Sequence, residues 1–406
     1  FATTSEETNI KCQFPRPIFI RRARGYVPEP IRIGGGNAEV IGCGSDIKNV
    51  FAITKAEYAI LSQHIGDMEN DATISFFEQT LKNLSEVYRF TPCAVGYDLN
   101  PDYYSSRLGQ EISERLDIPS FRLQHHECHI ASVVAEWGID RDVIGVSFDG
   151  AGYGWDGSIW GSEFMYFDGM QFKRLARFHD LVLPGGDLAT KQCWRCALSL
   201  MRNNLTEDDY WQYVRRLGFI EDYGEATIAN ITNMIDKKIS STISSGAGRY
   251  FDAVSYIVDA CRYNTYEGEA GIALESLAYH CDKGKDECYP FFIDKQDQSY
   301  IKVDFKETLY ALLNDRFSKT KRETIALRFH NTLINIVTDV VKNCVERCKT
   351  HVVVLSGGVL QNNLFLKGVI QGLIKEGLKV YFNSQVPLND GGIALGQVYL
   401  VRKYLQ

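Results

Sequence analysis

Apolar and polar residues follow one another along this chain with two different periods, which predicts a mixed α/β fold. Apolar runs at 50–53 and 58–61, joined by residues 54–57, are typical of a β-hairpin. Residues 74–88 carry apolar side chains on one helical stripe, which predicts an amphipathic helix. The pattern then predicts, in order, a strand over 94–99, a helix after Pro101, a strand leading to His125, a helix from there, a strand ending at Asp149 and a hairpin over 159–178.

The second half of the chain is richer in helical periodicity. Residues 187–280 have it almost throughout, and Asp187 is expected to cap the first of these helices. The remaining pattern predicts short strands within 291–305, a long helix over 323–344, a strand over 351–355, a helix from Asn362, a strand over 378–382 and a final helix after Gly392.

This order of elements predicts two α/β lobes with a helical insertion between them. We expect a connector arm over 1–35, a first lobe over 36–185 that carries the histidine-rich helix, and a second lobe over 186–406 that contains the helical insertion and a closing α/β segment. The arm holds a basic cluster, Arg21-Arg22-Ala23-Arg24-Gly25. These arginines are equally consistent with a solvated surface and with an arm that grips a phosphate or a neighbouring domain.

Composition narrows the class of protein. A chain of 406 residues with 45% hydrophobic and 23% charged residues is long enough for two cores. The net charge of -7 argues against a nucleic-acid surface as the main function. Since no run of about 18 apolar residues occurs, we expect no membrane span. The first residues lack the basic and apolar regions of a signal peptide.

The cysteines indicate a reducing, cytoplasmic environment. There are 11 of them, scattered along a large chain, which differs from the even, closely spaced set of a disulfide framework. Cys193 and Cys196 form one CxxC pair, but a zinc ribbon would need a second pair at similar spacing. We therefore expect most cysteines to be small buried hydrophobes.

Residues 125–129, His-His-Glu-Cys-His, are the clearest candidate for chemistry. On a helix, His125 and His129 lie one turn apart on one face. Asp149, at the end of a buried strand, and Asp390, in a downstream loop, add carboxylates. Two histidines with one or two aspartates make a metal site with room for substrate oxygens, and imidazole ligands favour iron or zinc over magnesium. A histidine pair alone is weak evidence, but three of the chain's eight histidines lie in these five residues.

Two glycine-rich turns after predicted strands suggest a nucleotide site between the lobes. Neither turn matches a dinucleotide-binding or Walker A motif, and each alone is consistent with an ordinary tight turn. Glycines let backbone N–H groups approach an anion, and a helix N-terminus adds further donors. The candidate nucleotide-binding residues of the two turns are Gly150, Ala151, Gly152 and Gly154 in the first and Gly357, Gly358 and Asn362 in the second.

Three further positions are candidates with ordinary structural alternatives. Asp252 and Glu269, in the helical region, could accept ribose hydroxyls or simply take part in helix capping and packing. Lys48, near the predicted hairpin, could meet a phosphate or carbonyl oxygen, although a surface lysine is the commoner case. We treat Asp149 and Lys48 as candidate catalytic residues.

Taken jointly, these motifs resemble the C-terminal domain of HypF, the hydrogenase-maturation carbamoyltransferase. The resemblance runs from about residue 16 to the C-terminus. It rests on residues 21–28, 61–67, Gln124-His125-His126, 148–154, Leu183-Pro184-Gly185-Gly186-Asp187, 248–254, Tyr266-Glu267-Gly268, 355–359 with Asn362, and 389–397.

The resemblance implies a two-lobed actin/hexokinase-type fold, close to the tRNA threonylcarbamoyl transferases and the antibiotic O-carbamoyltransferases. It also implies a single divalent metal ion bound by His125, His129 and Asp390, with Asp149 as a further ligand. Residues 150–154, Asp252, Gly268 and Asn362 would hold ATP, ADP or the nucleotide part of carbamoyl-adenylate. The carbamoyl group would then pass to the C-terminal cysteine of a HypE-like partner.

Two departures from the HypF pattern qualify this expectation. Glu127 and Cys128 stand where the family usually has another histidine or aromatic residue and then alanine, but neither is an expected ligand. Residues 1–35 are too few for the acylphosphatase, zinc-finger and YrdC-like domains of whole HypF, so we expect either its isolated last domain or a naturally separate protein. A YrdC-like adenylating domain or protein would then act upstream.

Three alternatives remain open at the level of sequence. The chain could carbamoylate a small-molecule hydroxyl or a tRNA adenosine, and its acidic charge argues mildly against tRNA. It could be a nucleotide-binding partner subunit without turnover. A kinase of the same fold is disfavoured, because such an enzyme binds magnesium mainly through phosphates and one or two carboxylates.

Overall fold

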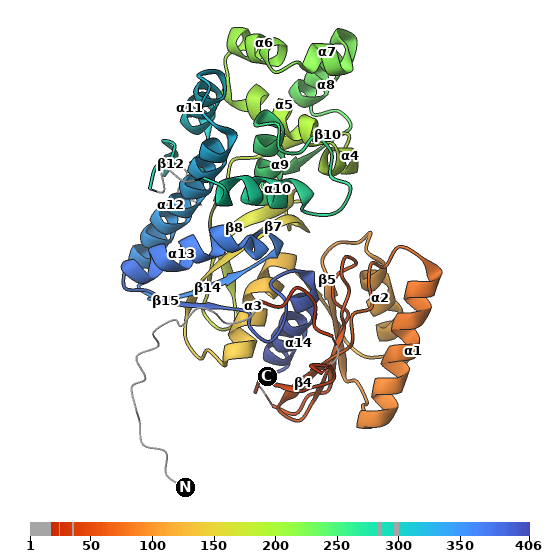
Figure 1. The fold of residues 1–406 in the computed structure, drawn as a ribbon. Coiled ribbons are helices and arrows are strands. Elements are labelled where there is room, and N and C mark those ends of the chain that lie inside the picture. Colours follow the sequence, from red (N-terminus) through yellow and green to blue (C-terminus); the bar gives the residue numbers. More distant parts are fainter. Residues whose placement is uncertain (1–17, 24, 35, 282–285, 296–299) are drawn as a thin grey trace.

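Two β-sheets with helices between and around them form the protein (Figure 1). The computed structural model describes residues 18–23, 25–34, 36–281, 286–295 and 300–406. About half of the expected connector arm, residues 1–17, lies outside the described residues, as does Arg24 of its basic cluster. The mixed α/β class expected from the sequence is confirmed by these sheets and helices.

The first sheet contains six strands in the order β1-β4-β3-β2-β5-β6. Its strands are β1 (Ile31–Arg32), β2 (Val40–Gly42), β3 (Ala52–Lys55), β4 (Tyr58–Leu61), β5 (Ala94–Asp98) and β6 (Ser120–Leu123). The hairpin expected over 50–61 is confirmed as β3 and β4. Strands β5 and β6 are parallel, with Asp98 opposite Leu123. Asp98 and the chain that continues to His125 therefore meet at one edge of this sheet.

The second sheet follows the order β12-β13-β9-β8-β7-β14-β15, with β10 and β11 attached beside β8. Its strands are β7 (Val143–Tyr153), β8 (Ile159–Phe167), β9 (Phe172–Phe178), β10 (Leu181–Pro184), β11 (Ser241–Ser244), β12 (Phe292–Asp294), β13 (Ile301–Asp304), β14 (Val352–Ser356) and β15 (Lys379–Phe382). Strands β7, β14 and β15 are parallel, and Ser356 at the carboxyl end of β14 lies beside Ser147 in the middle of β7. Every residue of β14 is buried, as expected for a strand covered on both faces.

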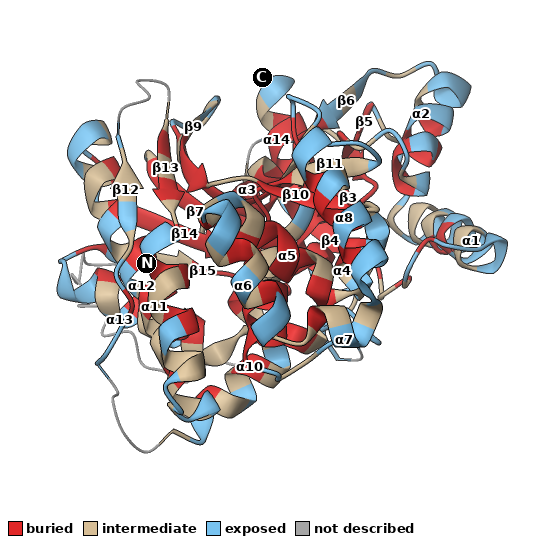
Figure 2. Ribbon diagram, turned by 90° about the horizontal axis from the view of Figure 1, so that it is seen from above, coloured by how far each residue is buried: buried red, intermediate tan, exposed pale blue. Residues whose placement is uncertain are grey.

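Helices α3 (His125–Trp137) and α14 (Ile393–Tyr404) pack against each other between the two sheets. Both are almost wholly buried (Figure 2). Gly396 makes their close approach possible, because a Cβ there would collide with the backbone carbonyl of Cys128. The Gln397 side chain then exchanges two hydrogen bonds with the backbone of Gly44, which ties α14 to the loop after β2.

The remaining helices cover the outer faces of the sheets. Around the first sheet lie α1 (Asp71–Tyr88) and α2 (Tyr104–Leu116). The expected helical insertion comprises α4 (Asp187–Lys191), α5 (Cys193–Asn204), α6 (Glu207–Arg216), α7 (Phe219–Tyr223), α8 (Glu225–Lys237), α9 (Ala247–Ile257) and α10 (Glu269–Tyr279). The closing segment contains α11 (Lys306–Phe317), α12 (Arg322–Cys348), the 3-10 turn η1 (Gly358–Gln361), α13 (Asn363–Lys375) and the short turn η2 (Asp390–Gly392). In Figure 1 the insertion, drawn in green, lies at the far end of the molecule from α1.

The stretch over 187–280 is almost wholly helical, as expected, and contains one short strand, β11. Two local expectations are wrong. Asp187 is the first residue of α4 and not its cap, because Gly186 occupies the cap position with a positive φ. The glycine loop expected after Asp149 is instead the end of β7, which runs on to Tyr153 and pairs with β8 across an irregularity between Phe148 and Gly152.

The strand pairing also bears on where the chain divides. Residues 143–184 contain β7 to β10, which belong to the second sheet. The boundary proposed at residue 185 therefore falls inside the range of that sheet, and strand pairing favours a division near residue 140. Among the helices that the structure describes, none is both long and apolar enough to cross a membrane.

Candidate metal centre

The first turn of α3 points two imidazoles in one direction. The Gln124 side chain caps this helix by accepting hydrogen bonds from the backbone N–H groups of His126 and Glu127. His125 and His129 are therefore helical from the start and share one face, as expected. Both side chains are fully buried.

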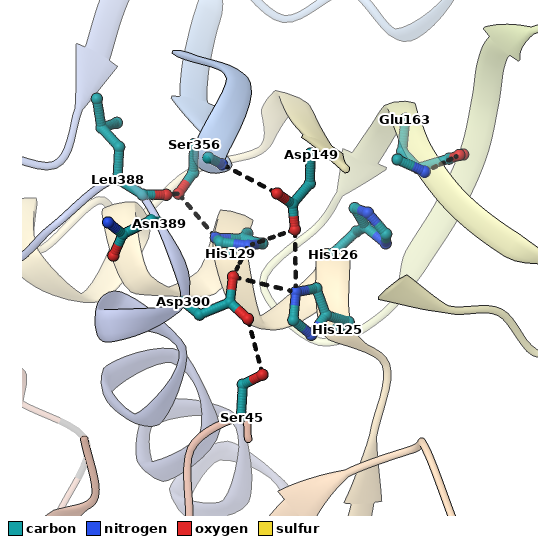
Figure 3. A network of polar contacts seen from close by, with 12 residues as sticks. Ser45, His125, His126, His129, Asp149, Glu163, Ser356, Leu388, Asn389 and Asp390 are labelled. Carbon is teal, nitrogen blue, oxygen red and sulfur yellow. Dashed lines mark hydrogen bonds and ion pairs between the residues drawn. The ribbon is translucent and has the colours of Figure 1, made fainter. Parts of the chain in front are cut away.

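Four side chains from α3, β7 and η2 converge on one point (Figure 3). One ligand atom each from His125, His129, Asp149 and Asp390 lies within 4.8 Å of the other three. The His125 Nε2 atom is 3.3 Å from Asp149 Oδ2 and 3.7 Å from Asp390 Oδ1. The corresponding distances from His129 Nε2 are 3.6 and 3.8 Å.

A second layer of hydrogen bonds orients these four side chains. His125 Nδ1 lies 2.8 Å from Asp98 Oδ2, and His129 Nδ1 lies 3.2 Å from Ser356 Oγ. Ser45 donates to Asp390 Oδ2 at 2.7 Å, and the backbone N–H of Gly358 donates to Asp149 Oδ1 at 3.3 Å. Partners of this kind fix which imidazole nitrogen faces the centre.

Opposite charges at the centre shift one another's pKa values so that the charged forms are favoured. Burial alone would lower the pKa of His125, but Asp390 and Asp98 outweigh it, so this pKa lies well above its ordinary value. Burial alone would raise the pKa of Asp149, but its interactions with the His125 and His129 rings hold it well below its usual range. The pKa of Asp390 is lowered by the same histidines against the opposing effect of burial.

The donor set fits a divalent transition metal. It combines two imidazole nitrogens with two carboxylate oxygens, all from buried residues, and His129 Nε2 has no hydrogen-bond partner. A buried nitrogen without a partner is costly unless something else binds it. Nitrogen and oxygen ligands in this number suit zinc or iron(II) better than magnesium. In the described part of the chain, no other group of His, Cys, Asp and Glu has this geometry, and Cys193 and Cys196 are buried free thiols.

The glycines at the end of β7 allow close packing. A Cβ at Gly152 would lie 2.5 Å from the His126 ring and 2.8 Å from the His125 ring, so only glycine lets this strand pass over the two imidazoles. A Cβ at Gly154 would run into the Trp160 indole. Ala151 is exposed, and Gly150 lies close to Gly248 at the start of α9. These contacts explain the glycines without a ligand, and their contact with a nucleotide remains a prediction.

The second glycine turn adjoins the metal centre. Gly357 has a φ of 109° and crosses under the backbone of Phe148, where no side chain could fit. A Cβ at Gly358 would lie 2.9 Å from Asp149 Oδ1. Substitution at Gly358 would therefore disturb a metal ligand as well as any bound nucleotide. Asn362 caps α13, as expected, and its amide also reaches His330 at 2.9 Å.

The other predicted nucleotide residues have partners within the protein. Asp252 is buried, paired with Arg249 at 3.0 Å and bonded to Asn264 at 2.9 Å. Glu269 is bonded to the backbone and hydroxyl of Thr265 at the start of α10. Arg249 was not predicted, although it lies in the motif around Asp252. Its guanidinium is largely buried, and Asp252 and Asp149 raise its pKa against the effect of burial.

Lys48, in the loop between β2 and β3, contacts the helical insertion. Its ammonium group forms an ion pair with Glu267, which precedes the Gly268 cap of α10. Burial would lower the pKa of Lys48, but Glu267, Asp390 and Asp149 together raise it. Lys48 thus lies within electrostatic reach of both metal-centre carboxylates. No sequence pattern indicated its partner, because Glu267 is more than two hundred residues away.

Comparison with known proteins places these features in one family. Residues 36–136 match the family model described as HypF Kae1-like domain, and residues 145–397 match the model described as carbamoyltransferase, Kae1-like domain, second subdomain. The chain is 32% identical to carbamoyltransferase HypF2 of Cupriavidus necator, over 95% of this chain and 49% of that protein. It is 30% identical to a HypF homolog of the same organism, over 91% of this chain and 93% of that protein.

A solved structure shares the fold. A crystal structure of full-length HypF in the phosphate- and nucleotide-bound form superposes with a TM-score of 0.89 at 34% identity. The superposition covers 96% of this chain and 49% of that one. The chain therefore has the fold of HypF, with two β-sheets and a helical insertion as expected. The relation of this fold to the actin/hexokinase type stays a prediction. The chain spans about half the length of most of the curated relatives it matches.

Proposed function

Since the chain belongs to the HypF carbamoyltransferase family, we propose that it transfers a carbamoyl group from carbamoyl-adenylate to the C-terminal cysteine of a HypE-like acceptor. This step would serve the maturation of the cyanide ligands of [NiFe]-hydrogenase. A YrdC-like domain or protein would supply the adenylate. The observation that carries the proposal is the buried cluster of His125, His129, Asp149 and Asp390.

His125, His129, Asp149 and Asp390 would hold one divalent ion, zinc or iron(II). The ion would polarise the oxygens of the carbamoyl-phosphate linkage and offset charge as AMP leaves. Asp98 and Ser356 hold the two imidazoles so that each presents Nε2 to the centre. Ser45 and the Gly358 N–H do the same for the two carboxylates.

Lys48 and Arg249 are cationic groups beside this cluster, and we propose that they attract the anionic adenylate. The nucleotide would lie along Gly150–Gly154, Gly357 and Gly358, toward Asp252, Gly268, Glu269 and Asn362. Attack by the acceptor thiolate on the carbamoyl carbon forms the C–S bond. The bond from that carbon to the phosphate oxygen then breaks, and AMP leaves with the electron pair.

The nucleophile belongs to the acceptor and not to this chain. Burial raises the pKa of Cys43 and of Cys196 to about 12, so neither thiol is a thiolate near neutral pH. Cys128 is fully buried behind α14, and burial also raises its pKa. The buried cysteines are therefore packing residues, in agreement with their apolar surroundings.

We expect this chain to carry out only the transfer step, in which the carbamoyl group passes from carbamoyl-adenylate to the acceptor, and not the formation of the adenylate. With carbamoyl phosphate, ATP and HypE it should not carbamoylate, because forming the adenylate falls to other domains in the family. With pre-formed carbamoyl-adenylate, or with a YrdC-like protein that makes it, HypE should gain one carbamoyl group in a metal-dependent reaction. Mass spectrometry of HypE under both conditions measures the outcome.

Each result of this experiment has a distinct meaning. Full activity from carbamoyl phosphate without an added protein would contradict the division of labour. Failure under both conditions, with nucleotide still bound tightly, would instead favour another acceptor or a subunit without turnover. A HypE variant that lacks the terminal cysteine is the matched control and should remain unmodified.

The metal-free protein should lose stability as the pH rises above neutral. The pKa of His125 is raised on folding, so its charge stabilises the folded state fully below its unfolded pKa of about 6.5. That contribution disappears as the pH rises through the folded pKa, by up to about 1.4 kcal/mol per pH unit. Urea unfolding in the presence of a chelator, between about pH 6 and pH 9, measures this slope.

Bound metal should reverse this dependence, because the ion displaces the His125 proton and binds more tightly as the pH rises. The variant His125→Gln should show a flatter profile in the chelator. A metal-free wild type whose stability is constant or increases over this range would contradict the assignment of the charge to His125.

A further inference from the structure

A row of buried polar side chains crosses the otherwise apolar contact between α3 and the second sheet. His129, Ser132 and Glu136 lie on one face of α3, at spacings of three and four residues. Ser356 ends β14 and Asn383 follows β15, so the two lie side by side on neighbouring parallel strands. These five residues are buried. A buried polar group is costly unless it forms hydrogen bonds. The hydrogen bonds within this row therefore show which atoms donate and which accept.

The hydrogen bonds that link His129, Ser356, Asn383 and Glu136 run in one direction. Ser132 lies beside them and donates to the backbone carbonyl of His129 at 2.7 Å. Asn383 donates through Nδ2 to Glu136 Oε2 at 3.2 Å. Its Oδ1 accepts from the Ser356 hydroxyl at 2.9 Å. With its one proton used in this way, Ser356 can only accept from His129 Nδ1, which lies 3.2 Å away. His129 then carries its proton on Nδ1 and presents the Nε2 lone pair to the metal centre.

Glu136 determines this direction because every group around its carboxylate is a donor. Its Oε1 accepts from the Ser384 N–H and hydroxyl at 2.8 Å and from the Gln385 N–H at 2.9 Å. Asn383 must therefore turn its NH₂ group, and not its oxygen, toward Oε2. The buried guanidinium of Arg22 adds a favourable charge nearby.

The same row holds the loop that carries Asp390. Glu136 binds the beginning of that loop at residues 384 and 385, while the Gly357 N–H binds its far end at Leu388 O, at 2.9 Å. Asn389 and Asp390 follow directly. One network thus reaches a histidine ligand on one side and an aspartate ligand on the other.

We infer that Glu136 and Asn383 are positioning residues that set the tautomer of His129 and the placement of Asp390. The inference rests on the proposed metal function. Neither residue touches the metal or the substrate. Their action passes through Ser356 to His129 and through residues 384–388 to Asp390.

The substitution Glu136→Gln should reverse the row. A glutamine oxygen can still accept from residues 384 and 385, but its NH₂ group then faces Asn383. The Asn383 amide would then flip and present NH₂ to Ser356, which loses its acceptor at 2.9 Å and turns its proton toward His129 Nδ1 or toward Leu388 O at 3.4 Å. When Ser356 donates to Nδ1, the His129 proton lies on Nε2 and must be lost before a metal ion can bind there. We expect zinc affinity to fall by about 10- to 100-fold, as is usual for residues that orient metal ligands.

The swapped double variant Glu136→Gln/Asn383→Asp should restore binding. The introduced glutamine would donate to one oxygen of the new carboxylate, and the other oxygen would again accept from Ser356, so His129 Nδ1 regains its donor role. Asn383→Asp alone should also weaken binding, because it places a second carboxylate beside Glu136, which holds the loop that carries Asp390. A merely structural role would not produce this rescue. Glu127→Gln is the matched control, since it makes the same substitution on the same helix outside the row.

Zinc affinity is measured by competition with a chromophoric chelator, and folding of each variant by its thermal unfolding without metal. The expected pattern is weak binding in both single variants, near wild-type binding in the double variant, and no change in Glu127→Gln. The inference is overturned if Glu136→Gln binds zinc as the wild type does, or if the double variant folds but binds no better than the single variants. A folded wild type that binds no zinc or iron(II) would instead overturn the metal centre itself.

Discussion

Replacing His129 with alanine should leave a folded protein without its metal ion. His129 supplies one of the four convergent ligand atoms, and its Nε2 atom has no hydrogen-bond partner. Loss of a direct ligand should cost more than loss of a residue that orients one, so we expect affinity to fall by well over about 100-fold. Metal content by inductively coupled plasma mass spectrometry should drop from one ion per chain to near zero.

His280→Ala is the control for this measurement, since it removes an exposed histidine at the end of α10. It should retain the full metal content and the full rate of carbamoyl transfer to HypE. Equal metal content in His129→Ala and the wild type would remove the cluster from the mechanism. The identity of the retained ion, zinc or iron, is read from the same samples.

Gly396→Ala should destabilise the protein although alanine is the better helix former. The added methyl group would enter the backbone of Cys128 where α14 crosses α3, and both partners are buried. Overpacking of this kind costs about 1–3 kcal/mol, and the contact here is with backbone, which cannot rotate away. Because α3 carries both histidine ligands, zinc affinity should decrease as well.

For the matched control, Gly271→Ala, we expect the opposite change in stability. Gly271 lies within α10, and a Cβ there meets no atom within 4 Å. Gly271→Ala should therefore stabilise the protein by about 0.5–1 kcal/mol through helix propensity alone. Urea unfolding of both variants measures the two effects. A stabilised Gly396→Ala would show that the two helices can separate without cost.

The parts of the site that follow a regular period were predictable from sequence. Helical spacing placed His125 and His129 on one face, and a buried apolar run placed Asp149 on a strand. The spacing of apolar residues does not show where a strand ends. The glycines after Asp149 suggested a loop, whereas they allow β7 to continue over the rings of His125 and His126.

The second layer of the site was missed because it depends on which strands are neighbours. Asp98 ends β5, and it reaches His125 only because β5 pairs with β6 in parallel. A carboxylate at the end of a buried strand was the available signal, and it carries no information about its partner. Ser45 likewise reaches Asp390 through a contact between residues far apart in the chain.

The wide spacing of the ligands has a consequence for how the protein folds. The four ligand residues span the chain from residue 125 to residue 390 and lie on α3, β7 and η2. Contacts between distant segments form late, because the loops between them must close first. An early folding intermediate can offer at most the neighbouring pair His125 and His129, so it should bind a metal ion only weakly. Tight binding therefore requires the second sheet and the final helix to be in place, which makes metal uptake a chemical check that the whole chain has folded before any carbamoyl group is handled.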